Sequence, residues 1–376
     1  TGSSGKTTVK EMIAAVLRLC HKPLVSQANL NNLIGLPMTV LNLRPEHTAA
    51  VVEAGINVVG EMDDLARAAR PDVAVITSIG PVHLAGLGSI ENVAREKFKL
   101  VRGLSSSGVA VIPAGESYLG PLVQEWGGRT LLFGMESGDV RASNVRIREE
   151  ALFRLNSPWG EQEIRLRIHG LHNVGNALAA AAASLALGAT LADVAAALAD
   201  FLPPALRMET VPLAGNRTLI RDCYNANPQS MSAALEVLSR FDLKGPLDSS
   251  GPDGIDQTTS HLDVPRRSRR RLRPVLAILG DMYELGPAAE QYHEGIGAEA
   301  ARLGIDRVVF VGALAEAYAK GYLAAGAPAE SITVAKDNEE AWEAISEELG
   351  LYGAILVKGS RMMKMETIAE RIVEGN

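Results

Sequence analysis

Apolar and polar positions along the chain follow two patterns in turn. Short apolar runs bounded by turn residues are found at 49–53, 73–77 and 109–112. Such runs are typical of strands that are buried on both faces of a sheet. Helical spacing of apolar residues is found between or before them, at 9–19, 61–69 and 89–103. Strands that alternate with helices in this way predict an α/β fold with a mostly parallel sheet.

The pattern changes after residue 139. Short alternating apolar positions at 139–168 predict a small antiparallel meander. Two alanine-rich helices are expected next, at about 172–187 and 191–200, and their small side chains favour close packing in a core. Phe-Leu-Pro-Pro at 201–204 then predicts a domain boundary.

Beyond residue 204 the alternation of strands and helices starts again. Strands are expected at 218–222, 274–279, 307–311, 331–334 and 354–357. Helices are expected at 229–240, 288–302, 313–325, 338–348 and 363–374. This order predicts a second, Rossmann-like α/β domain, although no G-x-G-x-x-G follows its first strand. The expected domains are therefore 1–203 and 204–376.

A long polar segment at 245–273 interrupts the second domain. It is rich in Ser, Asp, Gly, Pro and Thr and ends in an arginine cluster. Loops of this length inside a compact domain are usually functional or disordered. The arginines could bind a polyanion, but we favour a disordered, solvated insertion, and a drifting reading frame could give a similar composition.

Composition narrows the class of protein. A chain of 376 residues favours two domains, and a net charge of −7 gives no indication of nucleic-acid binding. Cys20 and Cys223 lie far apart, which argues against a disulfide framework or a zinc site, and both are expected to be buried apolar residues. The longest apolar-rich stretch, 177–187, is too short to span a membrane. We expect a cytoplasmic protein.

The first eight residues, Thr-Gly-Ser-Ser-Gly-Lys-Thr-Thr, match most of the phosphate-binding loop G-x-x-x-x-G-K-[ST]. Backbone amides of such a loop surround phosphates, Lys6 would reach the β- and γ-phosphates, and Thr7 would hold Mg²⁺. A Gly/Ser-rich remnant is the alternative, but the helical pattern that follows favours the loop. The first glycine of the motif would precede residue 1, so a fragment is expected. The candidate ATP-binding residues here are Gly2, Ser3, Ser4, Gly5, Lys6, Thr7 and Thr8.

Two residues, Glu53 and His83, could complete a metal site beside this loop, and His83 could instead contact a phosphate. Glu53 and His83 each follow a predicted strand, and the carboxyl ends of parallel strands face the ligand crevice. Glu53 could equally be a structural strand-end residue, and His83 could simply be exposed. Lys97 lies on a predicted helix and would, without context, be a surface lysine.

Polar turns elsewhere offer further candidates. Asn173 and Asn176 open the alanine-rich helix and could contact adenine, or Asn173 could cap the helix. The turn at 222–228 could bind a ribose or a base, or act as a helix cap. Lys-Gly-Ser-Arg at 358–361 could bind a carboxylate or a phosphate, because arginine offers a planar fork of donors.

Taken together, these stretches resemble the Mur ligase family and, within it, the MurF type. The loop at 1–8, Glu-Ala-Gly at 53–55 and His-Asn-x-x-Asn at 172–176 are shared by the wider family. Tyr-Asn-Ala-Asn-Pro at 224–228, Leu-Gly-Asp-Met-Tyr-Glu-Leu-Gly at 279–286 and Lys-Gly-Ser-Arg at 358–361 point to the MurF type.

The resemblance implies an ATP-dependent amide ligase of peptidoglycan precursor synthesis. In that family ATP phosphorylates a carboxylate of UDP-N-acetylmuramoyl-tripeptide, and the amine of D-alanyl-D-alanine attacks the resulting acyl phosphate. It also implies a phosphate-binding central domain, a Rossmann-like C-terminal domain and closure of the two during the reaction. The family's N-terminal domain, which binds the uridine nucleotide, is expected to be absent from this chain. We expect a monomer with no nucleic-acid partner and no membrane span.

The resemblance also assigns roles to individual residues. Lys6, His83 and Lys97 would be catalytic, and Lys97 matches a lysine that these ligases carry as a carbamate. The implied Mg²⁺ ligands are Thr7, Glu53, His83 and carbamylated Lys97. The implied ATP contacts outside the loop are Asn173, Asn176, Arg207, Asp222 and Asn225. The implied substrate contacts are Asn31, Asn32, Lys358, Ser360 and Arg361.

The chain departs from the family at several points. Ser78 stands where Asn is common, Leu206 precedes Arg207 where Gly is usual, and the segment at 245–273 has no family counterpart. The alternatives are a MurE-like or folylpolyglutamate-synthase-like ligase, which adds a single amino acid, and an inactive nucleotide-binding relative. An inactive copy need not retain Lys6, Glu53, His83 and Lys97 together, as this chain does.

Overall fold

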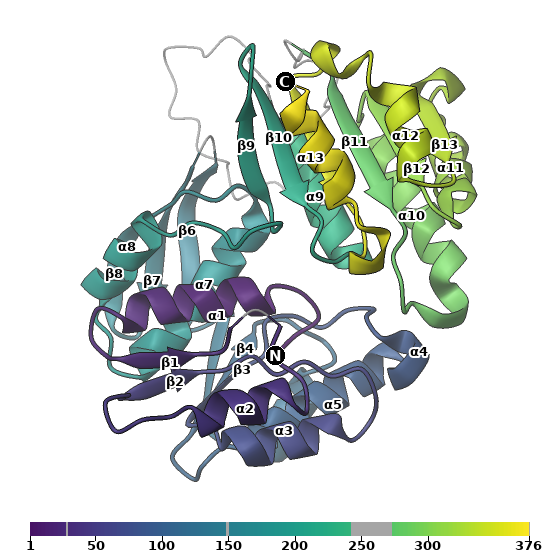
Figure 1. Cartoon of the computed structure of the whole chain (residues 1–376). Helices are drawn as coiled ribbons and strands as arrows, with labels where there is room; N and C mark the ends of the chain where they lie inside the picture. Colours follow the sequence, from purple (N-terminus) through teal and green to yellow (C-terminus); the bar gives the residue numbers. More distant parts are fainter. Residues whose placement is uncertain (28, 148–149, 242–272, 376) are drawn as a thin grey trace. The chain divides into compact units, whose positions relative to one another are not determined.

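The computed structural model describes residues 1–27, 29–147, 150–241 and 273–375. They form two compact units, Thr1–Pro204 and Ala205–Asn376 (Figure 1). Each unit has its own six-stranded sheet and a hydrophobic core on each face of that sheet. The polar segment expected at 245–273 lies, except for Arg273, outside the described residues.

The first unit is built on a sheet with the strand order β3-β4-β5-β6-β7-β8. Its strands are β3 (Val73–Val75), β4 (Val109–Pro113), β5 (Thr130–Gly134), β6 (Val140–Ile147), β7 (Ala151–Ser157) and β8 (Gly160–Leu166). Neighbours from β3 to β6 are parallel, and β6 to β8 are antiparallel, which confirms the expected meander. Two further strands, β1 (Pro23–Val25) and β2 (Ala49–Val51), form a separate parallel pair.

Helices cover both faces of this sheet. They are α1 (Lys6–Leu17), α2 (Gly35–Leu41), α3 (Glu61–Ala69), α4 (Leu84–Leu87), α5 (Ile90–Arg102), α6 (Gly120–Trp126), α7 (Leu171–Ala186) and α8 (Leu191–Ala199). On β4, Val109 and Val111 join the core formed with α1 and α7, whereas Ala110 and Ile112 join the core formed with α3 and α5. This is the alternation expected for a strand buried on both faces.

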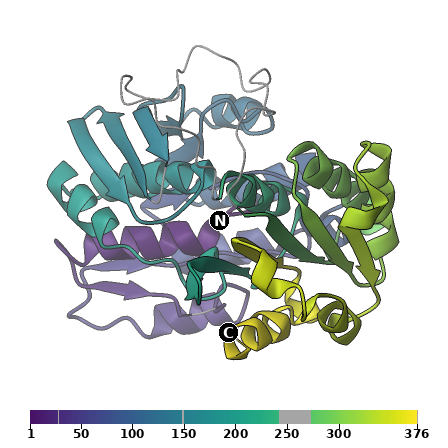
Figure 2. The ribbon, with the colours of Figure 1, turned by 90° about the horizontal axis from the view of Figure 1, so that it is seen from above.

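The alanine-rich helix α7 lies beside α1 in both views (Figures 1 and 2). Its alanines from Ala177 to Ala183 are almost fully buried, and side chains this small let two helices approach closely. The first helix of the unit, which carries the phosphate-binding loop at its start, is therefore held in the core along its length.

The second unit has the strand order β13-β12-β11-β14-β10-β9, parallel except for the edge strand β9. Its strands are β9 (Glu209–Leu213), β10 (Arg217–Asp222), β11 (Val275–Gly280), β12 (Arg307–Val311), β13 (Ile332–Ala335) and β14 (Ala354–Lys358). Its helices are α9 (Pro228–Arg240), α10 (Ala289–Arg302), α11 (Ala315–Ala324), α12 (Asn338–Ile345) and α13 (Glu366–Glu374). The expected Rossmann-like α/β architecture is confirmed.

Some local expectations are wrong. Cys20 is exposed, because it lies in the turn that follows α1 rather than on the buried face of the helix, whereas Cys223 is buried as expected. The run at 49–53 is not buried on both faces, since Ala50 is exposed. Within the described ranges, no helix combines the length and the apolar character needed to cross a membrane.

Candidate nucleotide and metal site

The phosphate-binding loop ends in a left-handed glycine from which α1 starts. Gly5 has φ 80° and is the N-cap of α1, so the first amides of the helix are directed toward the loop. A Cβ at residue 5 would lie 2.4 Å from Oδ1 of Asn176, on α7. Glycine is therefore required here both by the backbone conformation and by the close approach of Asn176.

The loop is held in shape by the segment that follows β3. The Ser3 amide donates to the Ser78 carbonyl oxygen (2.9 Å), and the Ser4 amide donates to Ser78 Oγ (2.9 Å). The Gly80 amide donates to Ser3 Oγ (2.9 Å). Lys6 Nζ donates to the Gly2 carbonyl oxygen across the loop (2.8 Å). The loop is thus held by bonds to the segment after β3 and by a bond within the loop itself. Ser78, which stands where Asn is common in the family, makes two of these bonds.

A carboxylate lies against the first turn of α1. Thr7 Oγ1 donates to Oε2 of Glu53 (2.7 Å), and Asn31 Nδ2 donates to Oε1 of the same carboxylate (2.8 Å). Glu53 follows β2 and is only 5% exposed. The structure therefore brings together Thr7 and Glu53, two of the four residues predicted to hold Mg²⁺. It also places Asn31, predicted as a substrate contact, on the same carboxylate.

Lys97 is buried, so the expectation of a surface lysine in the absence of context is wrong. It lies on the inner face of α5, and its side chain is among the largest that are fully buried. Burial holds the pKa of Lys97 well below its ordinary value, the charge of Lys6 lowers it further, and Glu53 acts in the opposite direction. The three residues share one electrostatic environment, and its net effect lowers the pKa of Lys97 and shifts the residue toward the neutral amine.

His83 lies in the same connection that holds the loop. It has a left-handed backbone (φ 51°), is half-buried and precedes α4, in which the Gly86 and Leu87 amides donate to its carbonyl oxygen. A left-handed histidine is uncommon and is often found at functional sites. Across the described residues, no group of three or more His, Cys, Asp or Glu side chains could hold a metal.

The two asparagines of α7 bond to each other. Asn176 Nδ2 donates to Asn173 Oδ1 (3.0 Å), and Asn173 Nδ2 donates to the His169 carbonyl oxygen (2.8 Å). The alternative that Asn173 caps the helix is wrong, because Gly170 is the N-cap and Asn173 lies within the first turn. The side chain of Asn176 is instead directed at Gly5 of the loop.

In the second unit, two candidates predicted for different ligands bond to each other. Lys358 Nζ, at the end of β14, pairs with Oδ2 of Asp222, at the end of β10 (2.6 Å), and donates to the Asn225 carbonyl oxygen (3.0 Å). Lys358 is 1% exposed. Its ammonium therefore holds the turn that carries Asp222 and Asn225. Asn227 and Ser230 cap α9 reciprocally, as the helix-cap alternative expects.

The remaining candidates of the second unit differ in exposure. The Arg207 guanidinium lies over the Tyr224 ring, 3.9 Å from its centroid. Ser360 is buried, and its hydroxyl accepts from the Tyr283 amide (2.9 Å). Arg361 is exposed and pairs with Glu366 (2.7 Å). Leu206 has φ 60°, which gives a physical reason for the glycine that is usual at this position in the family.

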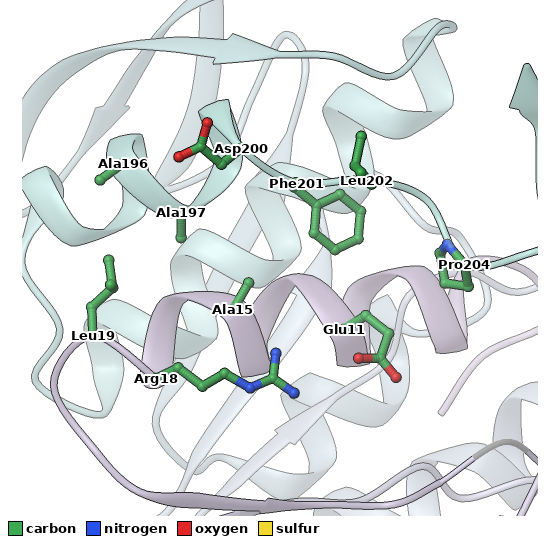
Figure 3. Close-up of a pocket in the computed structure, with 10 residues that line it drawn as sticks. All are labelled: Glu11, Ala15, Arg18, Leu19, Ala196, Ala197, Asp200, Phe201, Leu202 and Pro204. Carbon is green, nitrogen blue, oxygen red and sulfur yellow. The ribbon is translucent and has the colours of Figure 1, made fainter.

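A pocket of the first unit lies apart from these residues. It has a volume of about 510 Å³ and is formed by the outer face of α1 and the end of α8 with the segment after it (Figure 3). Its lining contains none of the candidate residues: Glu11, Ala15, Arg18, Leu19, Ala196, Ala197, Asp200, Phe201, Leu202 and Pro204. Asn32, the other predicted substrate contact in this unit, lies elsewhere: its Oδ1 accepts from the Ile34 and Gly35 amides at the start of α2.

Sequence reasoning missed several residues that shape the site. Thr77 Oγ1 donates to the Ser4 carbonyl oxygen, and Ser26 Oγ accepts from the Glu53 amide (3.2 Å). Both hydroxyl residues come directly after short apolar runs, at 73–76 and 24–25. Their position could have identified them, because a polar residue directly after a strand lies at the edge of the sheet where ligands bind.

The loop, the helix that starts from it and the largely parallel sheet define the first unit as a nucleotide-binding α/β domain of the phosphate-binding-loop class. Comparison with protein families is more specific. Residues 1–184 match the Mur ligase middle domain, and residues 251–361 match the Mur ligase, glutamate ligase domain.

Two curated relatives match along the whole chain, and both are named UDP-N-acetylmuramoyl-tripeptide--D-alanyl-D-alanine ligase. The relative from Escherichia coli K12 is 34% identical over 385 residues, covering 100% of this chain and 76% of that protein. The relative from Bacillus subtilis is 34% identical over 377 residues, covering 100% and 75%. The chain therefore belongs to the Mur ligase family, in its MurF group.

Solved structures agree with this assignment. MurF from Acinetobacter baumannii superposes with a TM-score of 0.85 at 33% identity, covering 99% of this chain and 75% of that one. The MurF ligase of Thermotoga maritima in complex with ADP has a TM-score of 0.82 at 23% identity, covering 100% and 78%. At that lower identity the likeness concerns the fold alone.

Proposed function

We propose that this chain is an ATP-dependent ligase that joins D-alanyl-D-alanine to UDP-N-acetylmuramoyl-tripeptide in peptidoglycan precursor synthesis. The observation that carries the proposal is the hydrogen bond between Thr7 and Glu53 beside the phosphate-binding loop. It occurs in a chain that is 34% identical, along its whole length, to ligases named for this reaction. We also propose a cytoplasmic location and a monomeric state.

The first step would transfer the γ-phosphoryl group of ATP to a carboxylate oxygen of the tripeptide. The bond between the β-phosphate bridging oxygen and the γ-phosphorus breaks, and ADP and an acyl phosphate form. Negative charge on the phosphates would be met by Lys6, by the loop amides and by the N-terminus of α1. Positioning and charge neutralisation therefore do most of the catalytic work.

The residues present fit a Mg²⁺ ion at this place. Thr7 and Glu53 put a hydroxyl and a carboxylate oxygen 2.7 Å apart, and Mg²⁺ prefers oxygen ligands. Mg²⁺ commonly takes few protein ligands and completes its shell with phosphate oxygens and water, so a small donor set is sufficient. When bound, the ion would supply positive charge at the β- and γ-phosphate oxygens.

Lys97 fits the role of a carbamate carrier. A carbamate forms when the neutral amine adds to carbon dioxide and a proton is released. Burial and Lys6 both favour that neutral amine by lowering the pKa of Lys97. The product is a carboxylate-like anion in the electrostatic environment of Glu53, which a cationic lysine could not provide. We propose that carbamylated Lys97 and His83 hold a second Mg²⁺.

In the second step the amine of D-alanyl-D-alanine would attack the carbonyl carbon of the acyl phosphate. The C–N bond forms, the bond from that carbon to the phosphate oxygen breaks, and the nitrogen loses a proton. Asn173 and Asn176, and in the second unit Arg207, Asp222 and Asn225, are proposed ATP contacts. Asn31, Asn32, Ser360 and Arg361 are proposed substrate contacts, whereas the bond from Lys358 to Asp222 supports a positioning role for Lys358.

Release of inorganic phosphate tests the proposal. We expect release from ATP only when UDP-N-acetylmuramoyl-tripeptide and D-alanyl-D-alanine are both present. Equal release with a single amino acid would favour a MurE-like or folylpolyglutamate-synthase-like ligase instead. Binding of ADP without release under any condition would favour an inactive nucleotide-binding relative.

A further inference from the structure

Lys10 is a buried cation close to the candidate metal site. It lies on α1, three residues after Thr7, and only 3% of its side chain is exposed. Its Nζ donates to the Ser26 carbonyl oxygen (2.7 Å) and pairs with Oε1 of Glu11 (2.8 Å). Burial of an ammonium is unfavourable unless its partners compensate for lost water, so a lysine here requires a specific reason.

The partners of Lys10 lead back to Glu53. Ser26 follows β1, is 1% exposed, and its amide donates to the Val51 carbonyl oxygen (3.0 Å). Its hydroxyl accepts from the Glu53 amide (3.2 Å), and the Glu53 carboxylate accepts from Thr7 (2.7 Å). Residues three apart lie on the same side of a helix, so Thr7 and Lys10 close a ring with Ser26 and Glu53.

This ring links α1 to the strand pair β1 and β2, which no sheet hydrogen bond in the described part of the chain joins to the rest of the unit. Among the described residues, β1 and β2 pair only with each other, and neither is bonded to the sheet that begins at β3. The place of Glu53 relative to α1 therefore depends on side-chain links. Lys10 bonds to Ser26, directly after β1, and Thr7 bonds to Glu53, two residues after β2, so α1 is attached to this strand pair at two points.

We propose that Lys10 is a positioning residue that holds Glu53 against Thr7 and so sets the strength of Mg²⁺ binding at the nucleotide site. The proposal rests on the proposed function, because it takes the Thr7–Glu53 pair as the place of the metal. Residues that orient metal ligands through hydrogen bonds commonly change metal affinity by about 10- to 100-fold when they are replaced.

Calorimetric titration of the chain with ADP, with and without Mg²⁺, tests the proposal. We expect Mg²⁺ to lower the Kd of the wild-type chain for ADP. The factor by which Mg²⁺ lowers this Kd should be about tenfold smaller in Lys10→Met. ADP binding without Mg²⁺ should stay within about twofold of wild type, since the loop itself is bonded to the segment after β3. Lys22→Met, an exposed lysine outside the ring, is the matched control and should behave as wild type.

Ser26→Ala provides a second variant in case Lys10→Met does not fold. It removes the hydroxyl that accepts from Glu53 but keeps the carbonyl oxygen that accepts from Lys10, and it should also lose most of the Mg²⁺ gain. If Mg²⁺ strengthens ADP binding in both variants as much as in the wild type, the positioning role is wrong, but the proposed function is unaffected. An equal loss of ADP binding with and without Mg²⁺ would show a merely structural role. Absence of ADP binding by the wild-type chain would overturn the proposed function, and this proposal with it.

Discussion

Three buried lysines show how the surroundings of a single residue type indicate different roles. Lys358 has the carboxylate of Asp222 at 2.6 Å, and Lys10 has that of Glu11 at 2.8 Å, so both ammonium groups have a counter-ion. Lys97 is placed differently, because burial and a second lysine both disfavour its charge. A lysine in such surroundings is suited to chemistry that starts from the neutral amine.

Replacement of Lys97 by methionine tests this interpretation. Lys97→Met keeps the length and apolar character of the stem, so the fold should persist while phosphate release falls by about a hundredfold or more, as when one charge-stabilising group is lost. Wild-type activity should also fall when bicarbonate and carbon dioxide are removed, and it should recover when they are restored. Mass spectrometry of the intact chain should show the added carbon dioxide.

Lys99→Met is the control for Lys97→Met. Lys99 lies on the same helix, but its ammonium is partly exposed and pairs with the exposed Asp63 and with the buried Glu96. Loss of these pairs should lower stability, but this variant should keep nearly full activity, because neither of these partners is a candidate site residue. Activity of Lys97→Met near the wild-type level, or a wild type that does not respond to bicarbonate, would contradict the carbamate.

Gly5→Ala should impair nucleotide binding. A Cβ at φ 80° is strained, and this one would also meet Asn176 at 2.4 Å. The loop would relax away from its shape and binding would have to restore it, so ADP affinity should fall by about tenfold or more, which corresponds to about 1.4 kcal/mol. Gly115→Ala, at φ 76° with no atom near its Cβ, should lose stability but not ADP affinity. Equal affinities of the two variants would contradict this.

At the scale of elements, α3 ends in a residue that suits glycine better than arginine. Arg70 is exposed, has φ 44° and is the C-cap of α3. Arg70→Gly should therefore stabilise the first unit by about 1 kcal/mol, because left-handed backbone is unfavourable for residues with a Cβ. Arg67→Gly, inside the same helix, should destabilise it by about 1 kcal/mol. Urea unfolding measures both, and a change of the same sign in the two variants would refute the argument.

A buried histidine links two elements of the second unit and makes its stability depend on pH. His293, on α10, accepts from the Met282 amide (3.0 Å), and its Nδ1 lies 2.6 Å from the Ala289 carbonyl oxygen. Burial lowers the pKa of His293, although Asp281, 3.9 Å away, partly opposes this shift. Folding therefore favours the neutral ring, and its contribution to stability is present above the unfolded pKa and is lost as the pH falls through it.

His293→Gln isolates this contribution. The free energy of unfolding of the wild type should exceed that of the variant by more at about pH 7.5 than at about pH 5.5, since the unfolded histidine titrates near 6.5. Burial raises the pKa of the Asp281 carboxyl group, so this group contributes more stability as the pH falls, which is opposite to the effect of His293. Fluorescence of Trp342, with Trp126 and Trp159 replaced by Phe, follows the second unit. A constant difference between wild type and variant would contradict the prediction.

Helices and strands were predictable from the sequence where their buried side chains produce a regular pattern of apolar positions. Among the elements that were missed are β9 and α6, and these two misses have a physical cause. β9 is an edge strand that contains Pro212, and proline in a run argues against a strand except at an edge. α6 has no buried residue, so it lacks the apolar stripe by which helices are recognised.

Candidate site residues could be named from the sequence where the motif itself carries the chemistry, as with Gly5, Thr7 and Glu53. Their environments could not be predicted, because they depend on residues distant in sequence. Lys97 is fully buried with Lys6 and Glu53 as its charged neighbours, and the partner of Lys358 is 136 residues away. The sequence could therefore name candidates, but it could not show that Asp222 and Lys358 bind each other.

At the scale of the whole molecule, each unit has separate cores on the two faces of its sheet. In the second unit, Ala277 and Leu279 of β11 join one cluster, and Leu276 and Ile278 join the other. The first unit is arranged in the same way around β4. Two units with independent cores need not unfold in one step, so the stability of each should be followed by its own reporter.

Binding of Mg-ADP should raise the stability of the first unit through its phosphate-binding loop. Trp126 packs edge-to-face on Phe98, which neighbours Lys97, so its fluorescence reports on this unit when Trp159 and Trp342 are replaced by Phe. With free nucleotide at about a hundred times its Kd, the free energy of unfolding should rise by about 2.7 kcal/mol, because the ligand binds only the folded state. If the affinity of Gly5→Ala for nucleotide is tenfold or more weaker, the same concentration should stabilise that variant by only about 1.4 kcal/mol or less. No stabilisation of the wild type, or an equal one in Gly5→Ala, would show that the loop at 1–8 is not where the nucleotide binds.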